Sequence, residues 1–160
     1  MSVEAVVPGS DGASGMIDNS DRSALEGMLK AYPAEQLVDE VGSANLFAVE
    51  GNVLKTPQLG GSILPGVTRD SVIKLASEIL KLDVHETDLT VEELLNANEV
   101  FCTGTAVVVT PIGKISTNEN EYVIGNGEMG SITAELRNLI LNIRSEVRED
   151  IFGWLNPLKI

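Results

Sequence analysis

The sequence predicts a single domain of the α/β class, and three observations lead to this prediction. Two stretches, around residues 67–80 and 132–147, place apolar residues at the spacing of one helix face. Several short apolar or β-branched runs predict strands, the longest of them covering residues 99–110. These patterns are interspersed without an internal repeat, and 160 residues are enough to bury one core.

The composition limits the classes of partner. The chain has 11 Lys and Arg residues against 24 Asp and Glu residues, which gives a net charge of −13. We therefore expect no nucleic-acid partner and no adhesion to an anionic membrane, because both require clustered basic side chains. The single cysteine, Cys102, and the single histidine, His85, exclude an intrachain disulfide and a Cys/His zinc cluster, so we expect no metal site.

The expected compartment follows from what the sequence lacks. No apolar run is long enough to span a bilayer, and the first residues are acidic or rich in Pro and Gly rather than typical of a targeting signal. We expect a soluble protein of a reducing compartment, cytoplasmic by default, with an organelle left open.

Residues 1–36 are expected to form a loose N-terminal segment, ahead of a folded domain over residues 37–160. Residues 1–22 are rich in Ser, Gly, Asp and Asn and show no sustained period. Apolar residues at helical spacing predict a short helix from Ser23 to about Leu37, although Pro33 is unfavourable to its second half.

A β-hairpin and a glycine-rich loop come next. Residues 44–50 and 53–56 predict two strands, joined by a tight turn at Gly51-Asn52 and stopped by Pro57. Residues 60–70 predict a loop that starts a helix near Val67 or Thr68. The free N–H groups and the dipole of such a helix start suit a phosphate, Gly66 would allow close approach, and Thr68 adds a hydroxyl. Simple helix capping would explain the same residues.

The rest of the chain predicts further strands and two more helices. Residues 84–87 suggest a short strand, and Thr90 with Glu93 matches a capping box that starts a helix through Ala97. Residues 99–110 predict a buried strand pair or one bent strand, interrupted at Gly104, with Cys102 packed and inert. Residues 121–124 predict a strand before a turn at 125–127. Ser131 is the expected N-cap of the second long helix, and residues 152–155 predict a terminal strand.

Several motifs, in order along the chain, resemble one known family. They are Asp39 to Phe47, Thr56-Pro57, Gly61 to Asp70, Glu99 to Ala106 and Asp150 to Trp154. Together they resemble the C-terminal large domain of branched-chain amino-acid aminotransferases, most closely the plant type, which are pyridoxal phosphate enzymes of fold type IV. The resemblance covers Glu40 to Leu155 and implies a mixed-sheet pseudo-barrel with flanking helices. D-amino-acid aminotransferases and aminodeoxychorismate lyases share this fold but fit the motifs less well.

The resemblance implies a binding role for five residues toward pyridoxal 5'-phosphate. Glu40 matches the carboxylate that keeps the pyridine nitrogen protonated, and Leu64 matches a residue packed on the ring. Val67 and Thr68 match the helix start that holds the phosphate, and Thr105 matches a second phosphate-binding hydroxyl. Without the resemblance, Glu40 would be interpreted as a solvated charge, Thr68 as an N-cap and Thr105 as a strand former.

The resemblance also implies a substrate site at the same turn. Thr105 and the backbone N–H of Ala106 match contacts to the substrate, the latter to its carboxylate. The substrates implied are small amino acids and 2-oxo acids, with the amino group of leucine, isoleucine or valine passing to 2-oxoglutarate.

The chain departs from this family in one respect that leaves two functions open. The family's catalytic lysine lies a few tens of residues before the position of Glu40, in the context of a small domain, whereas the first lysine here is Lys30, in an unrelated context. The chain therefore looks like an incomplete enzyme without the small domain. It either performs the transamination, with a partner supplying the lysine, or is a non-catalytic remnant. Such a remnant would bind cofactor weakly or act as a decoy subunit that pairs with a full-length homologue. For the chain in either role, the expected protein partner is a second copy in a homo-oligomer or a full-length homologue.

Overall fold

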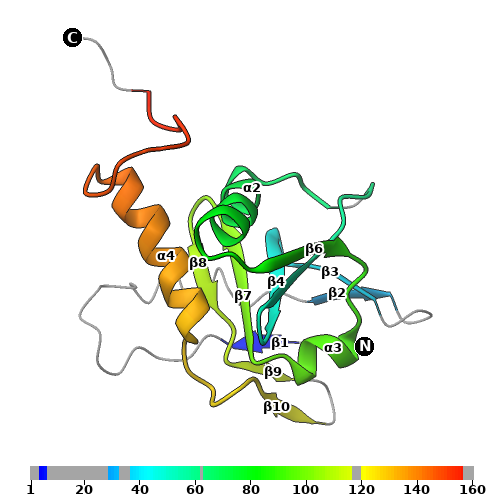
Figure 1. Cartoon of the computed structure of the whole chain (residues 1–160). Coiled ribbons are helices and arrows are strands. Elements are labelled where there is room, and N and C mark those ends of the chain that lie inside the picture. Colours follow the sequence, from blue (N-terminus) through cyan, green and yellow to red (C-terminus); the bar gives the residue numbers. More distant parts are fainter. Residues whose placement is uncertain (1–3, 7–28, 33–36, 62, 117–119, 157–160) are drawn as a thin grey trace.

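The computed structural model describes residues 4–6, 29–32, 37–61, 63–116 and 120–156, which build two sheets and the helices around them (Figure 1). The larger sheet has seven strands: β2 (Leu29–Tyr32), β3 (Leu37–Val41), β4 (Ala44–Glu50), β5 (Val53–Pro57), β6 (Asp83–Thr87), β7 (Glu99–Gly104) and β8 (Val108–Pro111). The smaller sheet has three: β1 (Glu4–Val6), β9 (Lys114–Ser116) and β10 (Glu121–Val123).

The larger sheet is mixed and open. Its order runs β2-β3-β4-β5-β6, and β7 pairs with the other side of β4 and with β8. Only β5 and β6 run parallel, since the helical segment between them returns the chain to the same end of the sheet. The predicted mixed sheet with flanking helices is therefore confirmed, but the sheet stays open rather than closing into a pseudo-barrel.

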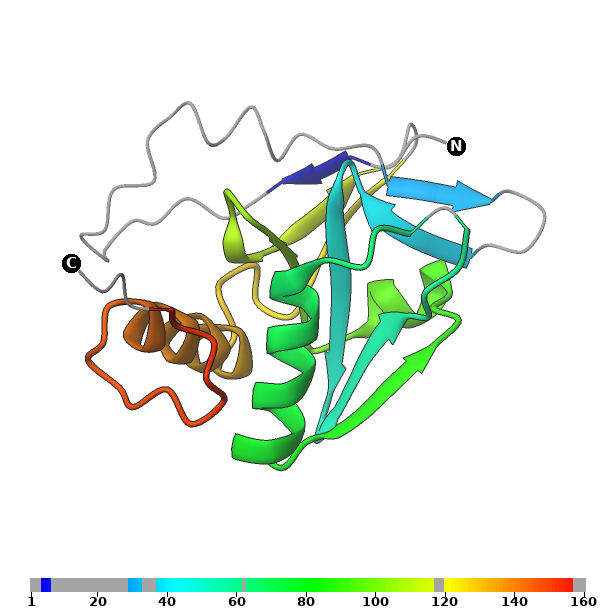
Figure 2. The same cartoon turned by 90° about the horizontal axis from the view of Figure 1, so that it is seen from above.

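Two helical segments cover one face of this sheet. The first comprises α2 (Val67–Lys74) and η1 (Leu75–Ile79), and the second is α4 (Ser131–Arg144). Seen from above, α2 lies between α4 and β4 (Figure 2). The core between them includes Val72, Leu75 and Leu136, packed around the stacked rings of Phe47 and Phe101, whose centroids are 4.9 Å apart. Both predicted long helices are thus confirmed.

The opposite face carries a second core that includes Leu46, Cys102 and Leu94, the last from α3 (Val91–Asn96). Alternate residues of β4 point to the two cores, because successive strand residues face opposite sides of a sheet. Cys102 is fully buried, and burial raises the pKa of its thiol to about 12, so it is the inert core residue that the sequence predicts.

Other local predictions are confirmed as well. The hairpin β4–β5 turns at Gly51, whose φ of 58° is in the left-handed region. Strand β6 forms as predicted, residues 99–110 form the antiparallel pair β7–β8, and β10 precedes the turn at residues 125–127.

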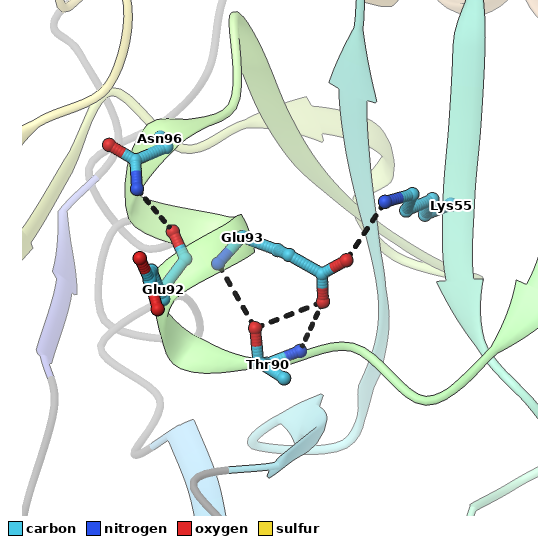
Figure 3. Close-up of polar contacts among 5 residues, drawn as sticks. All are labelled: Lys55, Thr90, Glu92, Glu93 and Asn96. Atoms are coloured by element: carbon cyan, nitrogen blue, oxygen red, sulfur yellow. Dashed lines mark hydrogen bonds and ion pairs between the residues drawn. The ribbon is translucent and has the colours of Figure 1, made fainter.

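The capping box at the start of α3 is complete (Figure 3). The Glu93 N–H donates to Thr90 Oγ1 over 3.1 Å, and the Thr90 N–H and hydroxyl both donate to Glu93 Oε2 over 2.9 Å. Lys55 reaches across from β5 and donates to Glu93 Oε1 over 2.8 Å, which ties the helix to the sheet. The hydrogen bond from Lys55 is the main reason that the pKa of Glu93 falls from its usual 4.5 to about 2.

Three further predictions are wrong, and in two of them a contact between residues distant in sequence decides the structure. The second half of the expected helix at 23–37 contains strand β2, because Leu29, Ala31 and Tyr32 pair with β3; residues 23–28 and 33–36 lie outside the described residues. Residues 152–155 form no strand; instead Gly153 turns the chain with a φ of 67°.

The third concerns the start of α4, where Gly130 rather than Ser131 is the N-cap. The Glu99 carboxylate accepts the N–H groups of Ile132 and Thr133 over 3.1 and 2.8 Å. Because a Cβ at Gly130 would overlap this carboxylate, only glycine leaves room for it.

Candidate functional site

A cavity of about 370 Å³ lies where β4, the start of α2 and the turn between β7 and β8 meet. It gathers five of the six residues that the sequence singles out: Leu64, Val67, Thr68, Thr105 and Ala106. The other described residues that line it are Val41, Ser43, Ala44, Asn45, Gly66, Thr103, Gly104 and Val107. The first residue of α2 and the turn after β7, which are far apart in the sequence, are thus brought to one place.

The start of α2 presents uncapped backbone donors to this cavity. Gly66 is the N-cap, its backbone is extended, and no side chain caps the helix. Thr68 is the second helical residue, so its interpretation as an N-cap is wrong and its hydroxyl is not used for that purpose. Free N–H groups and the helix dipole make this end of α2 suited to an anion.

Glu40 does not line the cavity but lies directly behind it. Its side chain is 4% exposed, and its Oε1 accepts the backbone N–H of Leu64 over 3.1 Å. The amide of Asn45 lies 3.4 Å from the same oxygen and donates to the Leu64 carbonyl over 2.8 Å. The interpretation of Glu40 as a solvated charge is therefore wrong, because the carboxylate is buried and oriented toward the loop that carries Leu64.

Asn45 also explains why residue 66 is glycine. A Cβ at Gly66 would overlap the Asn45 side-chain oxygen and lie within 3.6 Å of Arg69 Cβ. The space beside Gly66 is thus filled by Asn45, rather than kept open only for a ligand as the sequence suggested. Asn45 itself was missed as a site residue. The available signal was a lone amide within the otherwise apolar strand at residues 44–49.

Thr103 is a second residue that sequence reasoning missed. It lines the cavity, pairs in register with Asn45 across β4 and β7, and is fully buried. Its hydroxyl has no hydrogen-bond partner among the described residues. A buried hydroxyl without a partner is unfavourable, which is consistent with a bound polar group at this position.

Three of the described lysines, Lys55, Lys74 and Lys114, form ion pairs outside this cavity. Lys55 pairs with Glu93, as Figure 3 shows, and Lys114 pairs with Glu121 over 2.9 Å. Lys74 pairs with Asp70 on the surface of α2 and lines a neighbouring cavity of about 510 Å³ between α2 and α4. No lysine is among the described residues that line the cavity beside Gly66.

The described residues include neither a membrane-spanning helix nor a cluster suited to a metal ion. None of the described helices has the length and apolar character to cross a membrane. No group of three or more His, Cys, Asp or Glu side chains is placed to hold a metal ion in that part of the chain.

Comparison with known proteins gives one consistent result. The family model for amino-transferase class IV matches residues 32–115. The probable branched-chain-amino-acid aminotransferase of Staphylococcus epidermidis is 43% identical over 136 residues, which cover 81% of this chain and 36% of that protein. The chloroplastic branched-chain-amino-acid aminotransferase 3 of Arabidopsis thaliana is 39% identical over 135 residues, which cover 84% of this chain and 31% of that protein. The chain thus spans about a third of the length of these curated relatives.

A solved structure shares the fold. The branched-chain amino acid aminotransferase of Thermobaculum terrenum, in its form with pyridoxal phosphate, superposes with a TM-score of 0.73 at 32% identity. The superposition covers 88% of this chain and 45% of that one. The architecture described above is therefore that of one part of a branched-chain aminotransferase.

Proposed function

Because the chain belongs to the amino-transferase class IV family, we propose that its cavity beside α2 binds pyridoxal 5'-phosphate. The observation that carries this proposal is the convergence of three features at one place: the uncapped start of α2, the turn with Thr105, and the buried Glu40 behind Leu64. A cavity of about 370 Å³ also lies within the range of about 300–1,000 Å³ that is usual for small-molecule sites.

The residues present fit the chemistry of this cofactor. The N–H groups at Val67 and Thr68, together with the hydroxyls of Thr68 and Thr105, would hold the phosphate. The Thr103 hydroxyl, which has no hydrogen-bond partner in the described part of the chain, supports a polar ligand at the base of the cavity. No basic side chain is among the described lining residues, so the helix start would carry most of the attraction for the anion.

Glu40 would hold a proton at the pyridine nitrogen. Asn45 and the Leu64 N–H orient its carboxylate, and the exposed Leu64 side chain offers an apolar cover for the ring. When bound, a protonated pyridoxal phosphate supplies the electron sink for the carbanion of an amino acid.

The turn after β7 would take the amino-acid part of the substrate. Thr105 and Ala106 are exposed at the mouth of the cavity, where the Ala106 N–H can donate to a carboxylate. By analogy with the relatives, the substrates would be leucine, isoleucine or valine, with 2-oxoglutarate as the acceptor.

We further propose that this chain by itself binds the cofactor without transamination. A lysine is the group that these enzymes need to bond the cofactor and to move a proton, and none of the described lysines lines the cavity. Catalysis would then require a lysine from outside the described site, for instance from a full-length homologue with which this chain pairs as a subunit. A chain that pairs without gaining a lysine would be a decoy.

A titration with pyridoxal phosphate, followed by borohydride reduction and peptide mass mapping, tests both parts. We expect saturable binding that inorganic phosphate competes with, no single lysine labelled stoichiometrically, and no leucine-dependent formation of glutamate from 2-oxoglutarate. Absence of saturable binding would contradict the cofactor site. One stoichiometrically labelled lysine together with glutamate formation would contradict the proposal that the chain alone is inactive.

A further inference from the structure

The turn that joins β7 to β8 has an unfavourable backbone conformation. It carries Thr105 and Ala106 and re-enters the sheet at Val108, whose φ is 56°. A β-branched residue rarely adopts the left-handed region, because its side chain crowds the backbone there. Contacts outside the turn must therefore hold this conformation in place.

The contacts come from α4 and from β8 itself. The Arg137 guanidinium donates from Nη1 to the Val109 carbonyl over 2.7 Å and lies 3.5 Å from the Val107 carbonyl. The Thr110 hydroxyl donates to the same Val107 carbonyl over 2.8 Å. Among the described strands β8 pairs only with β7, so Arg137 supplies donors to carbonyls on the open side of an edge strand.

The helix that carries Arg137 is itself fixed to the same strand pair. Glu99, the first residue of β7, accepts the Ile132 and Thr133 N–H groups and the Thr133 hydroxyl at the start of α4. Glu99 thus connects α4 to β7, and Arg137 connects α4 to β8. These two strands flank the turn.

We propose that Arg137 is a positioning residue of the candidate site, which holds the turn between β7 and β8 so that Thr105 and Ala106 face the cavity. This inference rests on the proposed function only where it concerns ligand binding. Arg137 does not line the cavity and acts through the backbone carbonyls of Val107 and Val109.

The direct test is the mobility of the turn in the free protein. In the Arg137→Gln variant we expect the NMR order parameters of the Thr105, Ala106 and Val107 amides to fall below about 0.6, while those of α2 stay near 0.85. Arg137→Lys, which can still donate to the Val109 carbonyl, should keep most of the order. The control is Arg148→Gln, with the same charge change on a residue that makes no side-chain hydrogen bond among the described residues. Unchanged order parameters in Arg137→Gln would overturn the proposal.

Binding gives the second readout. Pyridoxamine 5'-phosphate probes the cofactor part of the site alone, whereas N-(5'-phosphopyridoxyl)-L-leucine adds the amino-acid carboxylate. Arg137→Gln should weaken binding of the leucine compound about tenfold and that of pyridoxamine 5'-phosphate by less than about twofold. An equal loss for both ligands would indicate general destabilisation and would also overturn the proposal. If the unaltered protein binds neither ligand, the proposed function fails, while the order parameters still decide the role of Arg137.

Discussion

At the scale of single residues, two buried side chains organise the candidate site: Asn45, which lines the cavity, and Glu40, which lies behind it. They hold Leu64 by its N–H and its carbonyl, so a buried carboxylate and a buried amide determine the conformation of the loop before α2. Neither contact is between neighbours in sequence. The loop is therefore ordered by its partners in β3 and β4 as well as by its own turn hydrogen bonds, from the Ile63 N–H to the Gly60 carbonyl and from the Gly66 N–H to the Leu64 carbonyl.

Replacing Glu40 with Gln removes the negative charge of this side chain but keeps its size and an acceptor oxygen. A glutamine keeps an oxygen that can accept the Leu64 N–H, so we expect the unfolding free energy to change by less than about 1 kcal/mol. The affinity for pyridoxal phosphate should fall about tenfold, because the neutral amide no longer stabilises a protonated pyridine nitrogen. The ¹⁵N chemical shift of the bound ring nitrogen reports its protonation. Asp39→Asn, on the opposite face of β3, should leave that shift unchanged, and a shift unaffected by Glu40→Gln would refute the assignment of Glu40.

Gly66→Ala tests the contact with Asn45. The added methyl group would overlap the Asn45 amide, so we expect a loss of about 1–3 kcal/mol in unfolding free energy and weaker binding of pyridoxal phosphate. Gly60→Ala is the matched control, because a Cβ there meets nothing within 4 Å, and it should change stability by less than about 0.5 kcal/mol. Equal stability of the two variants in urea unfolding would contradict this account.

At the scale of elements, helices α3 and α4 show that the start of a helix can be capped either by its own residues or by a side chain from another element. Thr90 and Glu93 cap α3 from within its own first turn, whereas Glu99 caps α4 from strand β7. The first arrangement is visible as a sequence pattern, and the second exists only after the strand and the helix have met. Both satisfy backbone donors that would otherwise be unpaired.

The capping box predicts a specific dependence of stability on pH. The folded-state pKa of Glu93 is depressed to about 2, so its contribution is complete above its unfolded value near 4.5 and is lost as the pH falls toward 2. Glu93→Gln should therefore cost up to about 1 kcal/mol near pH 7, since the pair with Lys55 is partly exposed, and the difference from the unaltered protein should vanish toward pH 2. Urea unfolding of both proteins between pH 7 and pH 2 measures this difference in unfolding free energy. The control is Glu92→Gln, on the same helix, whose effect on the unfolding free energy should not vary with pH. If the effect of Glu93→Gln is the same at every pH, the ion pair with Lys55 is not its cause.

At the scale of the whole molecule, apolar side chains are exposed around the start of α2. Leu59, Leu64 and Val67 are 49%, 63% and 84% exposed, whereas the core beneath them is closed. Exposed apolar side chains grouped on one face favour association. We propose that a second copy, or a full-length homologue, covers the cavity through this surface.

We therefore predict that the purified chain self-associates at micromolar concentration. Sedimentation velocity should show species larger than 17.0 kDa, and a hydrophobic dye should bind. Replacing Leu59, which does not line the cavity, with Ser should shift the distribution toward monomer. A monomer at all dilutions, without dye binding, would argue against an exposed association surface.

The parts of this fold that could be predicted are those that carry their own local signals. The turn at Gly51, the capping box at Thr90 and the apolar stripe of α4 each depend on neighbours in sequence, and all three are confirmed. Strand β2 and the Glu99 cap were not predicted, because each requires a partner that is distant in sequence or on another element. The cavity likewise depends on residues that are distant in sequence. Its floor depends on the register that places Asn45 opposite Thr103, which no single stretch of sequence encodes.

We propose above all that the uncapped start of α2 and the turn after β7 form one binding site. The most direct test of this proposal is an ¹H–¹⁵N correlation spectrum of the chain titrated with pyridoxal phosphate. We predict that the largest shift changes are confined to the amides of Leu64, Val67, Thr68, Thr105 and Ala106 and saturate together with one dissociation constant. No changes at these amides, or separate saturation of the α2 and turn signals, would contradict a single site.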